Sequence, residues 1–290
     1  MVATTPGNTS DWWSRTETER ALACMWIGQA GFLIRVGDLR IVIDPYISDS
    51  LAHKYRGTVY PHKRMMDPPI PPRGLTGADL VLCTHEHTDH LDPDTLPEIC
   101  TASPGARVVV PRFSLARAIR LGVPADRIVA LSAFERWDDR TVSVSALPAA
   151  HENVVTDSVG NRKYLGYVVR IGGYTVYHSG DTIPNAELES SLERFPSIDV
   201  AFLPCNGRDQ TRRSRGVPGN LTASEAISYH ERFGFRHTFL HHFGMFDFNT
   251  VDPTVVSDMV RSKGLDDSIT VPTAATVYRY TSPYASPANR

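Results

Sequence analysis

The chain has 290 residues, of which 41% are hydrophobic and 21% are charged, with a formal net charge of −2. This composition is typical of a globular protein, and the near-neutral charge excludes a general electrostatic attraction to nucleic acid or to anionic membranes. We therefore expect a small-molecule substrate, with no nucleic acid and no membrane as partner.

Neither the cysteines nor the start of the chain indicates export. The four cysteines are widely spaced and form no C-x-x-C pair, which argues against a disulfide framework. The first 20 residues lack the apolar segment of a signal peptide, and no run of about 18 apolar residues predicts a transmembrane helix. We expect a cytoplasmic protein.

The two ends of the chain, residues 1–20 and 282–290, are polar and turn-rich, and we expect both to be flexible or peripheral. Residues 21–281 would then form a single domain. Gly37-Asp38 and Gly172-Gly173 separate paired apolar runs and predict hairpin turns. In chain order the runs that predict strands are Met25–Ile27, Phe32–Val36, Arg40–Ile43, Leu80–Cys83, Val108–Val110, Ile128–Leu131, Val142–Ala146, Tyr164–Ile171, Thr175–Tyr177, Val200–Leu203, Thr238–Leu240 and Ala274–Tyr280.

Proline and capping signals predict helices between the later strands. Thr222–Glu225 is a capping box, and Asp252-Pro253 and Gly264 would begin and end another helix. Asp92-Pro93 repeats the start signal. Hairpins followed by alternating strands and helices favour an α/β fold of two mixed sheets with helices outside. The clearest predicted helices are Phe113–Leu121, Asn185–Phe195 and Ala223–Phe233.

Two long segments without periodicity, Ser48–Ala78 and Cys205–Asn220, are rich in basic residues. Long loops in compact domains often cover or line binding sites. The alternative for each basic residue is an ordinary solvated surface charge.

The segment THEHTDH, Thr84–His90, follows an apolar run and holds three of the chain's 11 histidines. Imidazole and carboxylate groups are ligands of zinc and similar divalent ions. On an extended turn, the side chains of residues i and i+2 can converge on one ion. Those of residues i+4 and i+5 then point to a second ion. The H-x-H-x-D-H pattern therefore predicts metal ligation by His85, His87, Asp89 and His90.

This pattern after a strand resembles the metallo-β-lactamase superfamily. The family's further ligands have matches in the same order: His151 after a strand, Asp181 in a strand-end Gly-Asp, and His242, with His241 as the competing choice. The resemblance covers roughly residues 22–280. It implies a single hydrolase domain with a metallo-β-lactamase-like αββα sandwich, in which two mixed sheets carry helices on their outer faces.

The resemblance also implies two divalent metal ions, expected to be zinc with manganese as the alternative, because these ligands suit either. Asp44 is expected to orient a ligand histidine, with a turn-capping role as the alternative. The implied ligands are His85, His87 and His151 at site one, Asp89, His90 and His242 at site two, and Asp181 as a bridge between them.

Relatives that use iron with oxygen replace the second histidine of the motif by glutamate, so His87 favours a redox-inert hydrolytic site. Two ions roughly 3.5–4 Å apart can hold a hydroxide nucleophile and polarise the attacked carbonyl or phosphoryl oxygen. We expect Asp89 and Asp181 to be the catalytic carboxylates. Asp89 would orient the hydroxide or pass its proton to the leaving group.

Several stretches resemble the L-ascorbate 6-phosphate lactonase family more specifically. One departure is His151, since the lactonase carries no histidine at that position. The full ligand set therefore implies a two-metal hydrolase whose substrate can differ from that of the lactonase. The matching stretches are Met25–Gly31, the PPIPP loop, Tyr177–Asp181, Arg215-Gly216, Thr222–Glu225 and His241–Pro253.

The basic loops are expected to flank the metal cleft and to bind a phosphate or carboxylate of the substrate. Asn206 and His178 would touch the substrate or, alternatively, support ligands, and His241 is expected to support ligands. The predicted substrate-binding residues are Lys54, Arg56, Arg64, Asn206, Arg212, Arg213 and Arg215.

The leading functional hypothesis is a lactonase-like, metal-dependent hydrolase of a small anionic cyclic ester. The first alternative is a phosphodiesterase acting on a small molecule, a lipid or nucleic acid, because the same two metals serve phosphoryl transfer equally well. A non-hydrolytic or noncatalytic protein on this scaffold ranks below both, because degenerate members lose ligands and this chain keeps seven. A homo-oligomer is compatible with the resemblance.

Overall fold

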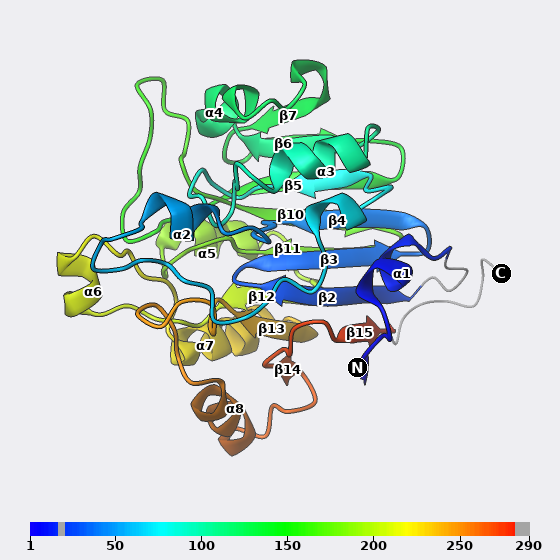
Figure 1. The fold of residues 1–290 in the computed structure, drawn as a ribbon. Coiled ribbons are helices and arrows are strands. Elements are labelled where there is room, and N and C mark those ends of the chain that lie inside the picture. The colour runs from blue at the N-terminus through cyan, green and yellow to red at the C-terminus, as the bar shows by residue number, and fades with distance from the viewer. Residues whose placement is uncertain (17–20, 282–290) are drawn as a thin grey trace.

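The computed structural model describes residues 1–16 and 21–281, and two mixed β-sheets form its centre. The first sheet has eight strands in the order β1-β15-β2-β3-β4-β5-β6-β7, and Figure 1 shows it in front of the second. Its strands are β1 (Val2–Thr4), β2 (Leu22–Gly28), β3 (Gly31–Val36), β4 (Leu39–Ile43), β5 (Leu80–Leu82), β6 (Arg107–Pro111), β7 (Ile128–Leu131) and β15 (Val277–Tyr280).

The second sheet has seven strands in the order β14-β13-β12-β11-β10-β9-β8. Strands β11, β12 and β13 run parallel, and β10 pairs antiparallel with both β9 and β11. Strands β9 and β11 therefore point the same way. The bounds are β8 (Arg136–Asp138), β9 (Val142–Pro148), β10 (Leu165–Ile171), β11 (Tyr174–His178), β12 (Val200–Pro204), β13 (His237–His241) and β14 (Ile269–Thr270).

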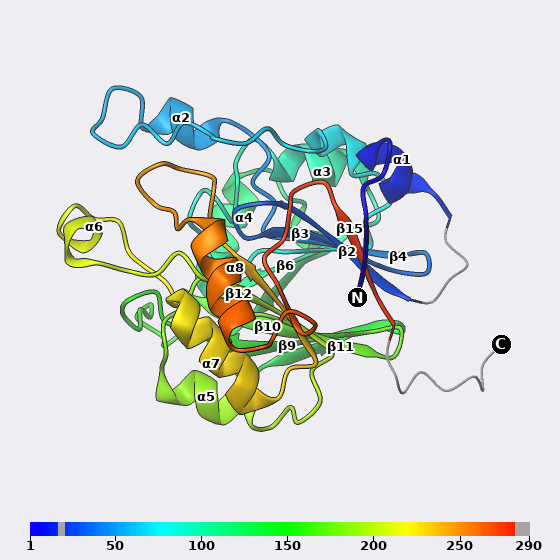
Figure 2. The ribbon, with the colours of Figure 1, turned by 90° about the horizontal axis from the view of Figure 1, so that it is seen from below.

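Helices cover both outer faces of the sandwich, and Figure 2 shows α1 and α3 on one side with α5, α7 and α8 on the other. The α/β class and the αββα arrangement predicted from the sequence are therefore confirmed. The helices are α1 (Thr9–Ser14), α2 (Ser50–Lys54), α3 (Leu96–Ala102), α4 (Leu115–Arg120), α5 (Ala186–Leu192), α6 (Gln210–Ser214), α7 (Ala223–Phe233) and α8 (Pro253–Ser262), with short 3₁₀ turns at Pro72–Gly74, Arg112–Ser114 and Ala125–Arg127.

The core between the sheets consists of aromatic and branched side chains, as the alternating strand pattern predicts. Phe32, Phe202 and Phe239 are fully buried there, and the ring centroids of Phe32 and Phe202 lie 4.2 Å apart. Burying aromatic side chains of this size is the main favourable contribution to packing two sheets together. None of the described helices is both long and apolar enough to cross a membrane.

Several local predictions are confirmed. Gly37-Asp38 turns β3 into β4, and Gly172-Gly173 turns β10 into β11, with both first glycines in the left-handed region. Thr222 and Glu225 exchange both hydrogen bonds of the capping box that opens α7. The Asp252 side chain accepts a hydrogen bond at the start of α8. The four cysteines are free and buried.

The N-terminal segment, expected to be flexible or peripheral, lies at the edge of the first sheet and packs on the domain. Strand β1 pairs antiparallel with β15, and Trp12 and Trp13 of α1 are buried against the first sheet. The Trp13 indole also donates to the carbonyl of Thr76 at 2.9 Å. Burial of two large aromatic rings holds this segment on the domain. Residues 17–20 and 282–290 lie outside the described part of the chain, so the expectation for them stays a prediction.

The Asp92-Pro93 pair does not begin a helix, because α3 begins only at Leu96. The buried Asp92 carboxylate instead accepts hydrogen bonds from the hydroxyls of Ser48 (2.6 Å), Ser50 (2.8 Å) and Thr95. Asp92 thereby ties the start of the Ser48–Ala78 segment to the loop that carries the histidine motif.

Replacing Asp92 by alanine should lower the free energy of unfolding by about 2 kcal/mol, because three hydroxyl donors lose a charged acceptor in a buried place. Urea denaturation of the wild type and the variant measures the difference. Asp94→Ala, two residues along and exposed, is the matched control and should change stability little. Equal effects of the two substitutions would contradict this account of Asp92.

Candidate metal centre

The predicted ligands meet because their strands end at one edge of the sandwich. His85–His90 follow β5, His151 follows β9, Asp181 follows β11 and His242 follows β13. Since β9, β11 and β13 share one direction, their carboxyl ends lie at the same edge of the second sheet, where ligands commonly bind in such folds.

The histidine motif forms a tight turn after β5. The backbone amides of His90 and Leu91 both donate to the carbonyl of His87, at 3.0 and 2.8 Å. The turn brings the ring centroids of His85 and His87 to 4.5 Å and those of His85 and His90 to 3.9 Å. One short loop therefore presents several imidazoles to the same space.

Asp181 lies at the centre of the cluster. Its Oδ2 is 3.2 Å from Nε2 of His242, 3.4 Å from Nε2 of His90 and 3.5 Å from Nε2 of His151. His90 and His242 belong to predicted site two and His151 to predicted site one. A single carboxylate oxygen thus contacts both predicted sites.

Two tight groups of ligand atoms are present among the described residues. The ligand atoms of Asp89, His90 and His242 lie within 4.8 Å of one another, which is the set predicted for site two. The other group joins His85, His90 and Asp181, and so cuts across the two predicted sets. The ring centroids of His87 and His151 lie 5.3 Å apart. The division into two ligand sets stays a prediction.

The buried atoms of this cluster fit a cation. Nε2 of His85, His90 and His242 and Oδ1 of Asp181 are buried and make no hydrogen bond. Buried polar atoms almost always have a partner, and imidazole nitrogens and carboxylate oxygens are what zinc or manganese would take. The residues present therefore suit a divalent metal.

Electrostatics favours the metal-binding forms of His85 and Asp181, whereas Asp181, Asp44 and Asp89 outweigh burial and raise the pKa of His90 well above its usual value. Burial, reinforced by His90 and His87, holds the pKa of His85 well below its usual value, so its imidazole is neutral. Burial alone would raise the pKa of Asp181, but His242 and His90 outweigh it and hold that pKa well below its usual range. Asp181 is therefore a carboxylate, the form that can bridge two ions.

Asp44 contacts His90 as the sequence suggested. Its Oδ2 accepts from His90 Nδ1 at 2.7 Å, while its oxygens also accept from the amide and hydroxyl of Thr84, each at 2.7 Å. His151 is held in a comparable way, with Nδ1 3.0 Å from the carbonyl of Gly219. Partners of this kind fix the tautomer and turn Nε2 toward the centre.

His178 and His241 lie behind the cluster. His178 Nε2 is 2.9 Å from the carbonyl of Ala30, and its Nδ1 accepts from the amide of Gly180 at 3.1 Å, which supports the turn that carries Asp181. The His241 ring stacks on His178 with a centroid distance of 5.1 Å and packs against Phe32. His242 rather than His241 therefore contacts Asp181.

Gln29 is a site residue that the sequence analysis did not single out. It lies in the turn between β2 and β3, fully buried, and its Nε2 donates to Asp89 Oδ2 at 2.8 Å. The main-chain carbonyl of Gln29 accepts hydrogen bonds from the backbone amide of His242 at 3.0 Å and from the indole of Trp26 at 2.9 Å. Gln29 thus connects two residues of predicted site two.

The backbone at these positions is unusual. Gln29, Asp44 and His242 have φ values of 52°, 43° and 70°, in the left-handed region that favours glycine. Their side chains are those that hold or contact the cluster. The sequence shows no glycine or asparagine there that would have indicated such turns.

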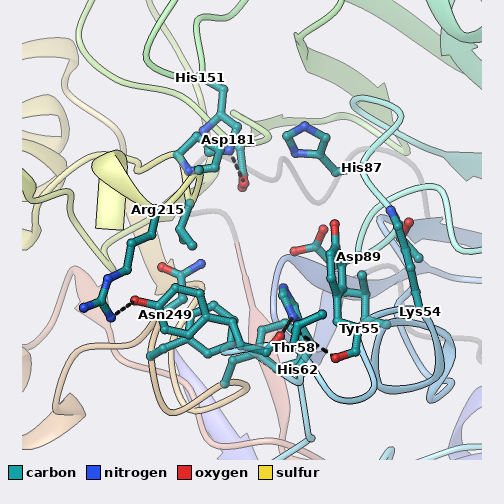
Figure 3. A pocket seen from close by; sticks show the side chains of 18 of the residues that line it. Lys54, Tyr55, Thr58, His62, His87, Asp89, His151, Asp181, Arg215 and Asn249 are labelled. Atoms are coloured by element: carbon teal, nitrogen blue, oxygen red, sulfur yellow. Dashed lines mark hydrogen bonds and ion pairs between the residues drawn. The ribbon is translucent and has the colours of Figure 1, made fainter. Parts of the chain in front are cut away.

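A cavity of about 600 Å³ opens beside the cluster, and His87, Asp89, His151 and Asp181 line it together with residues of the long loops (Figure 3). Of the seven predicted substrate-binding residues, only Lys54 and Arg215 line this cavity. Arg117 of α4 also lines it and was not predicted.

Arg212 and Asn206 lie outside the lining because they hold Asn249. The guanidinium of Arg212 donates to Asn249 Oδ1 at 2.8 Å and to the carbonyl of Asn206 at 3.1 Å. The amide of Asn206 donates to the same Asn249 oxygen at 2.8 Å. Both side chains therefore support the loop, and their contact with substrate stays a prediction.

Arg64, Arg213 and Arg56 also lie outside the lining of the cavity, and their contact with substrate stays a prediction. Arg64 donates to the carbonyls of Tyr46 and Ser48 at 3.0 and 3.1 Å, and so pins its own loop. Arg213 pairs with Glu152 at 3.0 Å. Arg56 is exposed and does not line the cavity.

A family model for the beta-lactamase superfamily domain matches residues 39–243, more than half of the chain. This chain belongs to the metallo-β-lactamase superfamily. The match spans the motif after β5, His151, Asp181 and His242, so the predicted superfamily is confirmed. The narrower resemblance to the ascorbate 6-phosphate lactonase family stays a prediction.

Other superfamily proteins are similar over much of the chain. A UPF0173 metal-dependent hydrolase of Pyrococcus furiosus is 30% identical over 184 residues, 63% of this chain and 71% of that protein. N-acyl-phosphatidylethanolamine-hydrolyzing phospholipase D 1 of Caenorhabditis elegans is 24% identical over 246 residues, 81% of this chain and 67% of that protein. Among solved structures, isothiocyanate hydrolase from Delia radicum gut bacteria superposes with a TM-score of 0.70 at 18% identity, covering 90% of this chain and 100% of that one, a likeness of fold.

Replacing Gln29 by leucine should weaken metal binding roughly tenfold or more, because Asp89 loses the donor that orients it. Metal affinity is measured by competition with a chromogenic chelator. Gln210→Leu, at an exposed position on α6, is the matched control and should bind metal like the wild type. An unchanged affinity in the Gln29 variant would remove this positioning role.

Proposed function

We propose that this superfamily member is a dinuclear, metal-dependent hydrolase of small, anionic cyclic esters of the lactone type. The observation that carries the proposal is the position of Asp181 Oδ2, 3.2–3.5 Å from imidazoles of both predicted sites. A carboxylate in this position suits a bridge between two ions.

Zinc is the proposed metal, with manganese as the alternative, and the proposed ligands are the seven residues of the motif and the later strand ends. When bound, the two ions would activate a water molecule and polarise the carbonyl oxygen of the ester. The hydrolase descriptions of the archaeal and nematode relatives support this reaction class.

Asp89 is the proposed proton-handling group. It lines the cavity, and one of its oxygens is held by Gln29, which fixes the direction of the other. Burial alone would raise the pKa of Asp89, but His90 and then His242 outweigh it and keep that pKa below its usual value. An ionised carboxylate at this place can accept the proton of the attacking water and deliver it to the leaving alkoxide.

Anionic substrates are favoured by the basic groups that remain at the cavity. Lys54 and Arg215 line it from the two long loops, and Figure 3 shows them on opposite sides of the opening. Either can pair with a carboxylate or phosphate of the substrate by a charge-assisted hydrogen bond.

A phosphodiester is the second candidate substrate. The same residues would serve phosphoryl transfer, and the nematode relative is by name a phospholipase D. A panel of γ-butyrolactone, δ-valerolactone and a lactone that carries a carboxylate against bis-p-nitrophenyl phosphate, tested with zinc-loaded and manganese-loaded protein, separates the two. Turnover of the phosphodiester alone would replace the lactone proposal with this one.

Asp89→Asn should lower kcat by roughly 100-fold or more, because the amide cannot accept a proton. Turnover of the preferred substrate from the panel and metal content by elemental analysis are both measured. Asp67→Asn, exposed in the Ser48–Ala78 segment, is the control and should keep full activity. Full metal content with full turnover in Asp89→Asn would show that the proton role is wrong.

Arg215→Ala should raise KM for an anionic substrate by roughly tenfold and leave KM for its neutral analogue unchanged, because one charge-assisted contact is lost. A lactone that carries a carboxylate and its methyl ester form the test pair. Arg120→Ala, exposed on α4, is the matched control. An unchanged KM for the anionic member would remove Arg215 from substrate binding.

A further inference from the structure

Aromatic rings form one side of the cavity beside the metal centre. Figure 3 shows Tyr55 and His62 at the bottom of the cavity, with the labelled ligands His151 and His87 at the top. The aromatic wall, as we call it, comes from two segments far apart in the sequence. It consists of Tyr55, Tyr60, His62, Phe246 and Phe248, all of which line the cavity.

The rings of the aromatic wall contact one another. His62 stacks on Tyr55 with centroids 4.2 Å apart and meets Phe248 edge-on at 4.7 Å. Tyr60 stacks on Phe248 at 4.3 Å, and Phe246 lies 5.0 Å from His62. Mutual packing holds these rings in place, so a ligand that uses the wall need not order it.

His62 behaves as a neutral ring in this wall. Its Nδ1 is 2.6 Å from the carbonyl of Tyr60, and burial lowers the pKa of the imidazole below its usual value. A neutral imidazole presents a flat, weakly polar face. The wall therefore suits an apolar, planar group rather than an anion.

Two cations lie beside the tyrosine rings of the wall. Lys54 Nζ lies 5.0 Å from the centre of the Tyr55 ring, and Arg215 lies 5.8 Å from that of Tyr60, to whose hydroxyl it donates at 2.9 Å. Both cations are exposed. A ligand with an aromatic ring and a terminal anionic group would place the ring against the aromatic wall and the anion beside Lys54 or Arg215.

We infer that the substrate is an aryl ester or aryl lactone with an anionic substituent, whose aromatic ring lies against the aromatic wall while its ester group faces the metal centre. This inference rests on the proposed hydrolase function and names its substrate class. A cavity of about 600 Å³ is within the range of pockets for such molecules.

The reaction can be written for dihydrocoumarin, the simplest aryl lactone, which lacks the anionic substituent. The oxygen of water forms a bond to the acyl carbon, and the bond from that carbon to the phenolic oxygen breaks. One proton of the water ends on the phenol and the other is released to solvent. The product, 3-(2-hydroxyphenyl)propanoate, carries the water oxygen in its carboxylate, and no oxidant or reductant is consumed.

The first experiment measures kcat/KM of the zinc-loaded full chain for dihydrocoumarin and for δ-valerolactone, which lacks the ring. Phe248→Leu should lower the value for dihydrocoumarin by roughly tenfold and change that for δ-valerolactone by less than about twofold. Phe233→Leu, a partly buried phenylalanine of α7 outside the cavity, is the matched control and should alter neither. Equal changes for both lactones in Phe248→Leu would overturn the inference.

The second experiment measures binding without turnover. Calorimetry compares 3-phenylpropanoate with 3-cyclohexylpropanoate, which have the same carboxylate and similar size but differ in flatness. The aryl acid should bind the zinc-loaded wild type several-fold more tightly, and Phe248→Leu should abolish that preference. No preference in the wild type, or no binding of either acid, would overturn the inference.

The two experiments separate the inference from the proposal on which it rests. Failure of the wild type to hydrolyse these two lactones and the carboxylate-bearing lactone of the Arg215 test would contradict the lactonase function, whereas the binding preference would still decide what the wall recognises. Hydrolysis of both lactones without any aryl preference in binding would keep the function and remove the aromatic substrate.

Discussion

The arrangement of this protein depends on one buried carboxylate, Asp181, surrounded by imidazole nitrogens. Imidazole lone pairs and a carboxylate repel one another when they are buried together. Burying them is costly unless a cation lies between them. The strands β5, β9, β11 and β13 all end at one edge, so each places a predicted ligand near Asp181 within a few residues of the strand end. Pairing of these strands therefore also brings the side chains of the centre together. The aromatic core between the sheets stabilises this arrangement.

Much of this could be predicted from local patterns in the sequence. The alternating runs, the Gly-Gly turn and the Thr222–Glu225 capping box each determine structure within a few residues, and each was placed correctly. The motif at Thr84–His90 indicated metal by itself, because so many ligand types rarely share one turn for another reason. His151, Asp181 and His242 could be assigned only through the family resemblance, since their convergence depends on how distant strands pair.

What the sequence could not supply were the partners of side chains in aperiodic segments. In the sequence, Arg212 and Arg64 resemble solvent-exposed cations. In the structure Arg212 donates a hydrogen bond to Asn249, and Arg64 donates to a backbone carbonyl. Asp92 precedes a proline, as helix N-caps often do. Its carboxylate instead accepts hydrogen bonds from the hydroxyls of Ser48 and Ser50, which lie in a distant segment. The aromatic wall was hidden for the same reason, because Tyr60 and Phe248 are far apart in the chain and stack only in the folded protein.

The left-handed backbone at Gln29, Asp44 and His242 has a consequence for how the protein can evolve. At each position glycine would relieve the backbone, but it would also delete a side chain that holds or contacts the cluster. Selection for stability and selection for activity therefore oppose each other at these three turns. A homologue that no longer needs the centre should become more stable when glycine replaces these residues. Glycine at the three positions would therefore mark homologues that have lost the activity.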